Sequence, residues 1–381
     1  MNSKSKLILL ALVPLSLASC GEVKPFINHL EDYAFEMAYH DDFNILQLTD
    51  IHWNYNTSTI KSKVYLDKVF EAATTHIRET QGPDARIDLV EITGDQFMLA
   101  NAYHVDSFIE YFEAQAEKYG FKYAVIWGNH DHHGIYNPNW LSDRFLRASH
   151  AIFYDANDDL YGRSNFVINL TEDGSENTET FWQLANIDSG ASFSERALSI
   201  SRDYDYIRPE QTKWWLAEHN RVGADVPTIA YYHIPQEENL QAWNAIHDQG
   251  ATYRHKFFKL ESFADNGNPR YASDFIDVGR INNLKAAFMG HAHNVDWTVD
   301  YDGVVIGLGV KTGTELYYAH IDVNSDDPAM KEGLASVGID ENFDLIGASL
   351  VTLTDTAGSF DLEHLYLNER TSGDFVRWVK W

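Results

Sequence analysis

Cysteine is almost absent from this sequence of 381 residues, which contains only Cys20. A single thiol excludes an intramolecular disulfide and a metal site built from several thiolates. Basic residues are also scarce, because 29 lysines and arginines stand against 57 aspartates and glutamates, giving a formal net charge of -28. Proteins bind nucleic acid and anionic lipid largely through Lys and Arg, so this balance argues against a nucleic-acid-binding surface and against electrostatic adhesion to membranes.

Long apolar runs are missing except at the N-terminus. The apolar run 7–17 follows Lys4 and Lys6 and is too short to cross a bilayer as a helix. A charged start followed by a short apolar run is typical of an export signal. The run ends in Leu-Ala-Ser-Cys-Gly, which resembles the lipobox of bacterial lipoproteins, where the cysteine becomes the acylated first residue. We therefore expect a signal peptide over residues 1–19, lipidation of Cys20, and an exported lipoprotein anchored to a membrane of the bacterial cell envelope or periplasm. An ordinary cleaved signal is the alternative.

The rest of the chain has the composition of a folded protein, with 44% hydrophobic and 14% aromatic residues. It contains no internal repeat, low-complexity tract or Pro-rich linker. Residues 20–42 mix charged and aromatic side chains without a clear period, and we interpret them as a tether. One folded domain is then expected over residues 43–381.

Apolar runs alternate with segments of helical spacing from residue 44 onward. The runs 45–49, 87–93 and 123–127 predict buried strands, and apolar side chains recur at helical spacing between them. This β-α-β-α-β series predicts parallel strands, whose C-terminal ends are where open α/β sheets place ligands. Later segments predict an insertion at 137–160, a hairpin at 166–186, a helix from Pro209, and strands at 228–232, 286–289, 350–354 and 360–367.

Polar residues follow the predicted strands at the points where these strands end. Five separate segments supply them, namely Asp50 with His52, Asp95, Asn129 with His130, His233, and His291 with His293. Each motif alone has a structural explanation, since Gly-Asp is commonly a turn and Asn commonly caps a helix. Five such motifs in order indicate a shared site. Carboxylate, imidazole and amide oxygen are suitable ligands for a pair of metal ions, and two such ions can hydrolyse phosphate esters.

In these motifs the sequence resembles the calcineurin-like metallophosphoesterases over roughly residues 44–310. The matching blocks are Asp50-Ile51-His52, Gly94-Asp95, Gly128-Asn129-His130-Asp131, His233, and Gly290-His291-Ala292-His293. The resemblance implies an α/β fold, specifically a four-layer α-β-β-α sandwich of two mixed sheets flanked by helices. It also implies that Asp50, His52 and His293 hold one metal ion, that Asn129, His233 and His291 hold the other, and that Asp95 bridges the two.

The resemblance further implies that His130 faces the substrate and that Asp131 orients the His130 ring. His132 and His133 follow this block and are candidate substrate-binding residues. Trp53 has equal claims to a substrate contact and to an ordinary place in the core. His247, His255 and Tyr232 could also reach the site, and the sequence alone does not place them.

The Asp-x-His block, the Trp214-Trp215 pair and His233-Ile234-Pro235 resemble the purple-acid-phosphatase-related branch of this family. Purple enzymes have a tyrosine three positions after the bridging aspartate, whereas this chain has Met98. We therefore expect no iron–tyrosinate colour, and the two ions could be iron, manganese or zinc.

The expected activity is hydrolysis of a small phosphorylated substrate, most simply a phosphomonoester, by a hydroxide held between the two ions. A phosphodiesterase or nucleotidase with the same centre is the alternative among enzymes. An alternative of another class is a surface-binding lipoprotein without turnover. The sequence does not indicate the oligomeric state.

Overall fold

The computed structural model describes residues 33–54, 57–98, 100–132, 138–156, 160–191, 204–262, 269, 271–368 and 376–381. The signal peptide expected over residues 1–19 and Cys20 lie outside this part of the chain. Among the described residues, no helix combines the length and the apolar character needed to cross a membrane.

Two large mixed sheets form the centre of the molecule. One sheet has the order β17-β16-β15-β2-β3-β4-β5, and the other has the order β1-β6-β7-β8-β10-β12-β11-β9. The strands of the seven-stranded sheet are β2 (Phe43–Leu48), β3 (Leu89–Thr93), β4 (Lys122–Ile126), β5 (Ala151–Ile152), β15 (Gly347–Leu353), β16 (Phe360–Leu367) and β17 (Val376–Lys380).

The eight-stranded sheet and a small two-stranded sheet contain the remaining strands. The larger of these comprises β1 (Ala34–Ala38), β6 (Phe166–Thr171), β7 (Thr180–Asn186), β8 (Thr228–Tyr231), β9 (His255–Lys256), β10 (Leu284–Met289), β11 (Thr298–Tyr301) and β12 (Val304–Leu308). The two-stranded sheet pairs β13 (His320–Ile321) with β14 (Phe343–Asp344).

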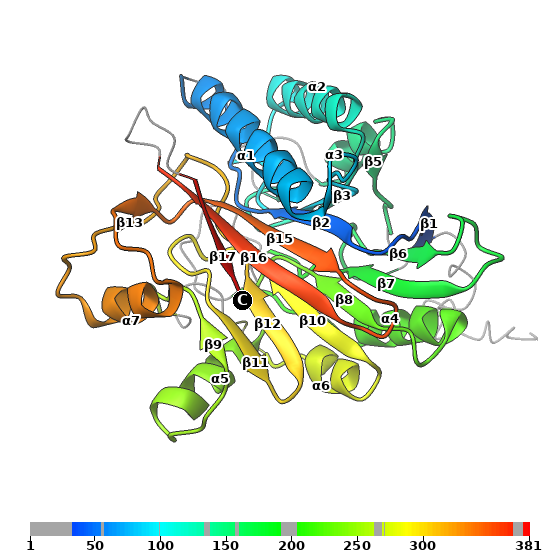
Figure 1. The fold of residues 1–381 in the computed structure, drawn as a ribbon. Helices are drawn as coiled ribbons and strands as arrows, with labels where there is room; N and C mark the ends of the chain where they lie inside the picture. Colours follow the sequence, from blue (N-terminus) through cyan, green and yellow to red (C-terminus); the bar gives the residue numbers. More distant parts are fainter. Residues whose placement is uncertain are drawn as a thin grey trace, which may run out of the picture.

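The helices lie on the outer faces of the two sheets (Figure 1). On the seven-stranded sheet α1 (Thr57–Gln81) contacts β15 and α2 (Ala102–Tyr119) contacts β4, while α3 (Pro138–Phe145) packs on α2. On the eight-stranded sheet α4 (Pro209–Val222) contacts β7 and α6 (Phe275–Arg280) contacts β10. Two more helices, α5 (Glu237–His247) and α7 (Pro328–Val337), lie beside β9.

The sheets face each other across a buried interior that contains polar as well as apolar side chains. Gln47 of β2 donates from Nε2 to the carbonyl oxygen of Met289 in β10 at 3.2 Å. Strands β2, β3 and β4 pair in parallel, as do β8 and β10. The predicted α-β-β-α sandwich of two mixed sheets is thereby confirmed.

One described segment differs from its expected place. Residues 34–38 fall in the segment interpreted as a tether, yet they form β1, which pairs in parallel with β6 from Ala34↔Val167 to Ala38↔Thr171. Phe35 packs against Phe166 with ring centroids 5.7 Å apart. Because all of its residues are partly or fully exposed, without alternation between buried and exposed positions, β1 left no local period to recognise. The folded domain therefore begins before residue 43.

Candidate metal centre

The strand-end residues of the sequence come together where the two sheets meet. Asp50 and His52 follow β2, Asp95 follows β3, and Asn129 follows β4, so all four come from the seven-stranded sheet. The eight-stranded sheet supplies the other ligands, because His233 follows β8 and both His291 and His293 follow β10. The C-terminal ends of parallel strands from two sheets thus converge on one buried site.

One group of possible ligands contains Asp50, His52 and His293, all of them buried. The Nε2 atoms of His52 and His293 are 3.0 Å apart. The Oδ1 atom of Asp50 lies 3.4 Å from Nε2 of His293 and 3.8 Å from Nε2 of His52. Three electron-pair donors therefore point at one another across a space that a metal ion fits.

The second group contains Asp95, His233 and His291, with Asn129 beside them. The Oδ1 atom of Asn129 lies 3.1 Å from Nε2 of His233 and 2.7 Å from Nδ1 of His291. The Oδ1 atom of Asp95 is 3.4 Å from Nε2 of His233. On its other side, the Oδ2 atom of Asp95 is 3.8 Å from Nε2 of His52. The two oxygens of Asp95 thus face the two groups, as a bridging carboxylate must.

The backbone at this site adopts conformations that most residues avoid. Asp50, His52, Asp95 and His291 have φ angles of 52°, 50°, 53° and 77°. A positive φ costs energy in residues other than glycine and is commonly stored at functional sites. Four of these ligands therefore turn sharply at strand ends, which aims their side chains into the site.

Burial and local charge set the protonation of the ligands. Burial lowers the pKa of His291 to about 3, and it also lowers the pKa values of His52 and His293. Burial acts to raise the pKa of Asp95, but the charges of His233 and His130 outweigh it and hold that pKa well below its ordinary value. Burial acts to lower the pKa of His233, but the charges of Asp95 and Asp50 outweigh it and raise that pKa to about 9. Neutral imidazoles and an ionised carboxylate are the forms that bind metal ions, so His233 must release its proton when an ion binds.

The donor atoms fit a pair of cations. The Oδ1 atom of Asp50, which faces the imidazoles of His52 and His293, is buried without a hydrogen-bond partner among the described residues. Buried polar atoms are normally paired, and buried carboxylates require a counter-charge. Six buried side chains with their donor atoms turned inward, and with Asp95 between the two groups, match the ligand set of a dinuclear metal site.

His130 and Asp131 lie beside this centre in different ways. The His130 side chain is 24% exposed, whereas that of Asp95 is 1% exposed, and Nε2 of His130 is 4.0 Å from Asp95 Oδ2. The buried Asp131 carboxylate accepts hydrogen bonds from the backbone N–H groups of Phe97 and Gly128 at 3.0 and 2.8 Å. Asp131 therefore ties together the loops after β3 and β4, and its expected role in orienting His130 stays a prediction.

The remaining candidates from the sequence have different locations. Trp53 is fully buried, donates from Nε1 to Ser107 Oγ and packs on Phe108, so it is a core residue. Tyr232 is likewise fully buried.

The histidines among the candidates differ. His132 lies in the described part of the chain, and burial lowers the pKa of its imidazole. His133 lies outside the described residues. His247 and His255 belong to a separate cluster with Glu332.

Three residues that the sequence did not indicate border the centre. The Tyr204 ring lies 4.3 Å from the His291 ring, and the Tyr317 ring lies 4.7 Å from the His293 ring. Lys311 is buried and donates from Nζ to the carbonyl oxygen of Asp50 at 2.7 Å, and burial lowers its pKa to about 8. All three come from segments outside helices and strands, so no periodic pattern marked them.

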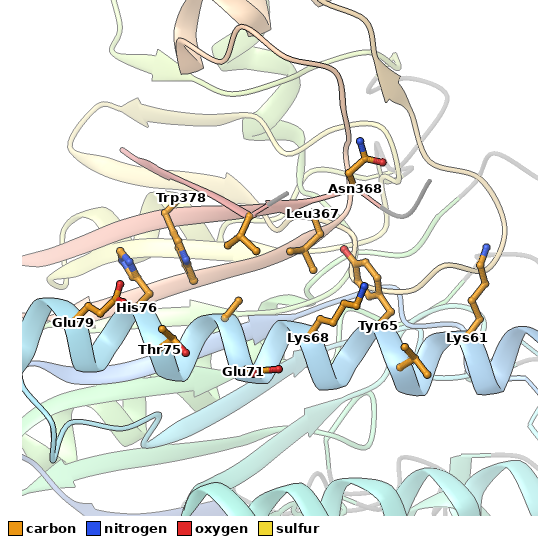
Figure 2. Close-up of a pocket in the computed structure, with 13 residues that line it drawn as sticks. Lys61, Tyr65, Lys68, Glu71, Thr75, His76, Glu79, Leu367, Asn368 and Trp378 are labelled. Atoms are coloured by element: carbon orange, nitrogen blue, oxygen red, sulfur yellow. The ribbon is translucent and has the colours of Figure 1, made fainter. Parts of the chain in front are cut away.

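A separate groove of about 640 Å³ lies between α1 and the strands β16 and β17. Figure 2 shows Tyr65 and Lys68 of α1 on one side and Leu367 and Trp378 on the other. The described residues that line it include none of the predicted metal ligands. The groove is therefore not the centre at which the ligands meet.

Comparison with known proteins agrees with this geometry. The sequence profile of the calcineurin-like phosphoesterases matches residues 43–295. A relative from Arabidopsis thaliana, named probable inactive purple acid phosphatase 28, is 26% identical over 74% of this chain and 73% of its own length. Phosphatase DCR2 of Saccharomyces cerevisiae is 24% identical over 68% of this chain, which spans 45% of that protein.

A solved structure with a similar arrangement is a dimetal phosphatase from Danio rerio, with a TM-score of 0.45 and 11% identity over 90% of this chain and all of that chain. The family match covers well over half of the chain and includes the motifs that supply all of the predicted ligands. The calcineurin-like phosphoesterases are a family whose activity is metal-dependent hydrolysis of phosphoesters. The chain therefore belongs to this family, in the branch related to the purple acid phosphatases.

Proposed function

We propose that this protein is an active dinuclear metallophosphoesterase that hydrolyses phosphomonoesters. The observation that carries the proposal is the position of Asp95, whose two carboxylate oxygens face the two groups of ligands. Two bound cations would neutralise charge on the phosphoryl oxygens and supply nucleophilic water at neutral pH. Asp50, His52 and His293 would hold one ion, and Asn129, His233 and His291 would hold the other.

His130 is the residue that we assign to the substrate. Its ring lies 5.1 Å from that of His52, and its partial exposure leaves it open to a ligand at the centre. An imidazole in this place can donate a hydrogen bond to the phosphoryl group or a proton to the leaving oxygen. Tyr204 and Tyr317, whose rings lie against His291 and His293, would then border the leaving group.

The experiment that tests activity is turnover of a generic aryl phosphate before and after chelation and reloading with iron, manganese or zinc. We expect about two ions per chain at this centre and activity that chelation abolishes and metal restores. The name of the Arabidopsis relative makes the contrary result a real alternative. No turnover with any of the three metals would favour a binding lipoprotein instead.

Replacing His130 tests the role of that side chain. We predict that His130→Ala lowers kcat by about 10²–10⁴-fold, the usual contribution of an acid–base group, while the metal content stays at the wild-type value. Metal analysis and kinetics on the same preparation check this. Loss of metal together with the imidazole would contradict the role that we assign to His130.

Paired substrates separate the two enzymatic alternatives. A monoester and a diester with the same leaving group should differ in kcat/KM in favour of the monoester. A preference for the diester would favour a phosphodiesterase, and a preference for nucleoside monophosphates over simple aryl esters would favour a nucleotidase.

We also propose that the protein is an exported lipoprotein, a proposal that rests on the sequence around Cys20. The Cys20→Ser variant should lose incorporation of labelled fatty acid and should move from the membrane fraction to the soluble fraction. Retention of both the label and the membrane location would contradict lipidation at this residue.

A further inference from the structure

A third group of possible metal ligands lies at the surface, away from the dinuclear centre. It consists of His247 at the end of α5, His255 in β9 and Glu332 in α7, and we refer to it as the His247–His255–Glu332 cluster. One donor atom of each side chain lies within 4.8 Å of the others. Figure 1 shows α5, β9 and α7 grouped at one end of the molecule. The cluster shares no residue with the dinuclear centre.

The hydrogen bonds of the two imidazoles determine which nitrogen faces the carboxylate. Nδ1 of His247 lies 3.0 Å from the carbonyl oxygen of Trp243, and Nδ1 of His255 lies 3.3 Å from that of Tyr253. A carbonyl oxygen accepts hydrogen bonds only, so each Nδ1 carries the proton. In the neutral rings, Nε2 is then left with a lone pair, and this backbone bond is the one that metal-binding histidines usually make.

Both Nε2 atoms point at the same acceptor. His247 Nε2 and His255 Nε2 are each 3.2 Å from Oε1 of Glu332. Two lone pairs directed at a carboxylate oxygen repel it unless a metal ion or a ring proton lies between them. In a tetrahedral zinc site with bonds of 2.0–2.1 Å, neighbouring ligand atoms are about 3.3 Å apart, which agrees with both distances.

The surrounding fold holds the three side chains in place. The His247 ring stacks on Trp243 with centroids 3.5 Å apart and an interplanar angle of 18°. Helix α7 lies so close to the segment after β9 that a Cβ on Gly333, next to Glu332, would come within 2.2 Å of the Phe258 ring. Ser336 Oγ also accepts a hydrogen bond from the backbone N–H of Phe257 at 2.9 Å. The His247 ring and the backbone that carries Glu332 are therefore held in place before any ion binds.

We propose that the His247–His255–Glu332 cluster is a surface binding site for a divalent transition metal ion, with zinc as the best match. Two imidazoles and a carboxylate are ligands that zinc accepts, and the partial exposure of the cluster leaves a fourth position for water. The ion would clamp α7 to the end of α5, the helix that begins four residues after His233 in the chain. This proposal does not depend on the proposed catalytic activity.

The test is the zinc content of tag-free protein after removal of metal, reloading with zinc and dialysis. We expect wild-type protein to retain one zinc ion per chain more than His247→Ala/His255→Ala, whatever number the dinuclear centre holds. His150→Ala is the matched control, because His150 is 25% exposed and 2.9 Å from a Glu113 oxygen, compared with 26% exposure for His247. This control should retain the wild-type zinc content.

A second readout guards against loss of folding in the double variant. Glu332→Gln keeps the shape of the side chain and removes its charge, and it should also lose the additional zinc ion, with an unchanged circular dichroism spectrum. Equal zinc contents in wild-type protein and in a folded variant of either kind would overturn the proposal. The cluster would then be two histidine side chains hydrogen-bonded to one carboxylate.

Discussion

Glu91 is a buried carboxyl group that has no place in the chemistry of the dinuclear centre. It lies in β3, its Oε1 atom is 3.5 Å from Nδ2 of Asn186 in β7, and its Oε2 atom has no hydrogen-bond partner among the described residues. Burial raises its pKa to about 8. The side chain is therefore protonated at neutral pH in the folded protein.

This raised pKa predicts that Glu91 makes stability fall as pH rises. Between the unfolded pKa near 4.5 and the folded pKa of about 8, the unfolded chain has released the proton and the native chain still holds it. Each pH unit in this window then removes roughly 1.4 kcal/mol from the free energy of unfolding. Glu91→Gln, which cannot ionise, should lose this dependence and should be the more stable protein at pH 7.

Urea unfolding of both proteins at pH 5.5 and pH 7.5 measures this difference. Other titrating groups contribute equally to both proteins, so the change in the difference between them isolates Glu91. An equal loss of stability in the two proteins across this range would contradict the prediction.

At the scale of residues, the sequence predicted the candidate ligands that the structure brings together and missed their neighbours. Asp50, Asp95 and the other candidate ligands each follow a recognisable apolar strand, so local spacing marked their positions, whereas their assignment to two metal ions came from the resemblance to the family. Tyr204 and Lys311 reach the centre from segments without a period, and only the tertiary fold brings them there. Trp53 could not be assigned from the sequence, because a tryptophan beside a ligand can turn either toward the substrate or into the core.

At the scale of elements, the loops after β3 and β4 approach each other more closely than a side chain allows. A Cβ on Gly128 would lie 2.3 Å from both the backbone nitrogen and the Oδ1 atom of Asp95. Asp95 Oδ1 also accepts a hydrogen bond from the backbone N–H of His130 at 2.7 Å. Glycine is therefore required there so that the end of β4 can hold the bridging carboxylate in position.

We predict that Gly128→Ala displaces Asp95 and lowers metal affinity by at least about tenfold, with a parallel loss of turnover, as expected when the support of a ligand is disturbed. Gly338→Ala is the control, because that glycine has a φ of 71° and no neighbouring atom within 4 Å of the added Cβ. It should cost about 1 kcal/mol of stability and leave metal content unchanged. Full metal occupancy in Gly128→Ala would contradict this account of the loops.

Elements with strong periods were predicted more successfully than those on the edges of the sheets. The hairpin of β6 and β7 and helix α4 match their expected segments. The edge strands β1 and β17 were missed, since both are largely exposed or half-buried and show little alternation between buried and exposed residues. Helix α7 was also missed, and with it the association of Glu332 with His247 and His255.

At the scale of the whole molecule, the dinuclear centre links the two sheets. Asp50, His52, Asp95 and Asn129 come from one sheet, and His233, His291 and His293 come from the other. Without cations, the charge of His233 partly balances the carboxylates of Asp50 and Asp95. Bound ions would add bonds to ligands from both sheets and so hold the sheets together more firmly.

We therefore predict that chelation lowers the Tm of the protein and that restoring metal raises it again. At a metal concentration of about 100 times Kd, binding adds about 2.7 kcal/mol to the free energy of unfolding. For a chain of this size the change in Tm is on the order of 4 °C. Asp95→Asn keeps the size of the bridging side chain and removes its charge, so most of the shift should disappear in that variant. An equal shift in the variant and in wild-type protein would mean that the stabilising ion binds elsewhere, and the His247–His255–Glu332 cluster would be the first site to examine.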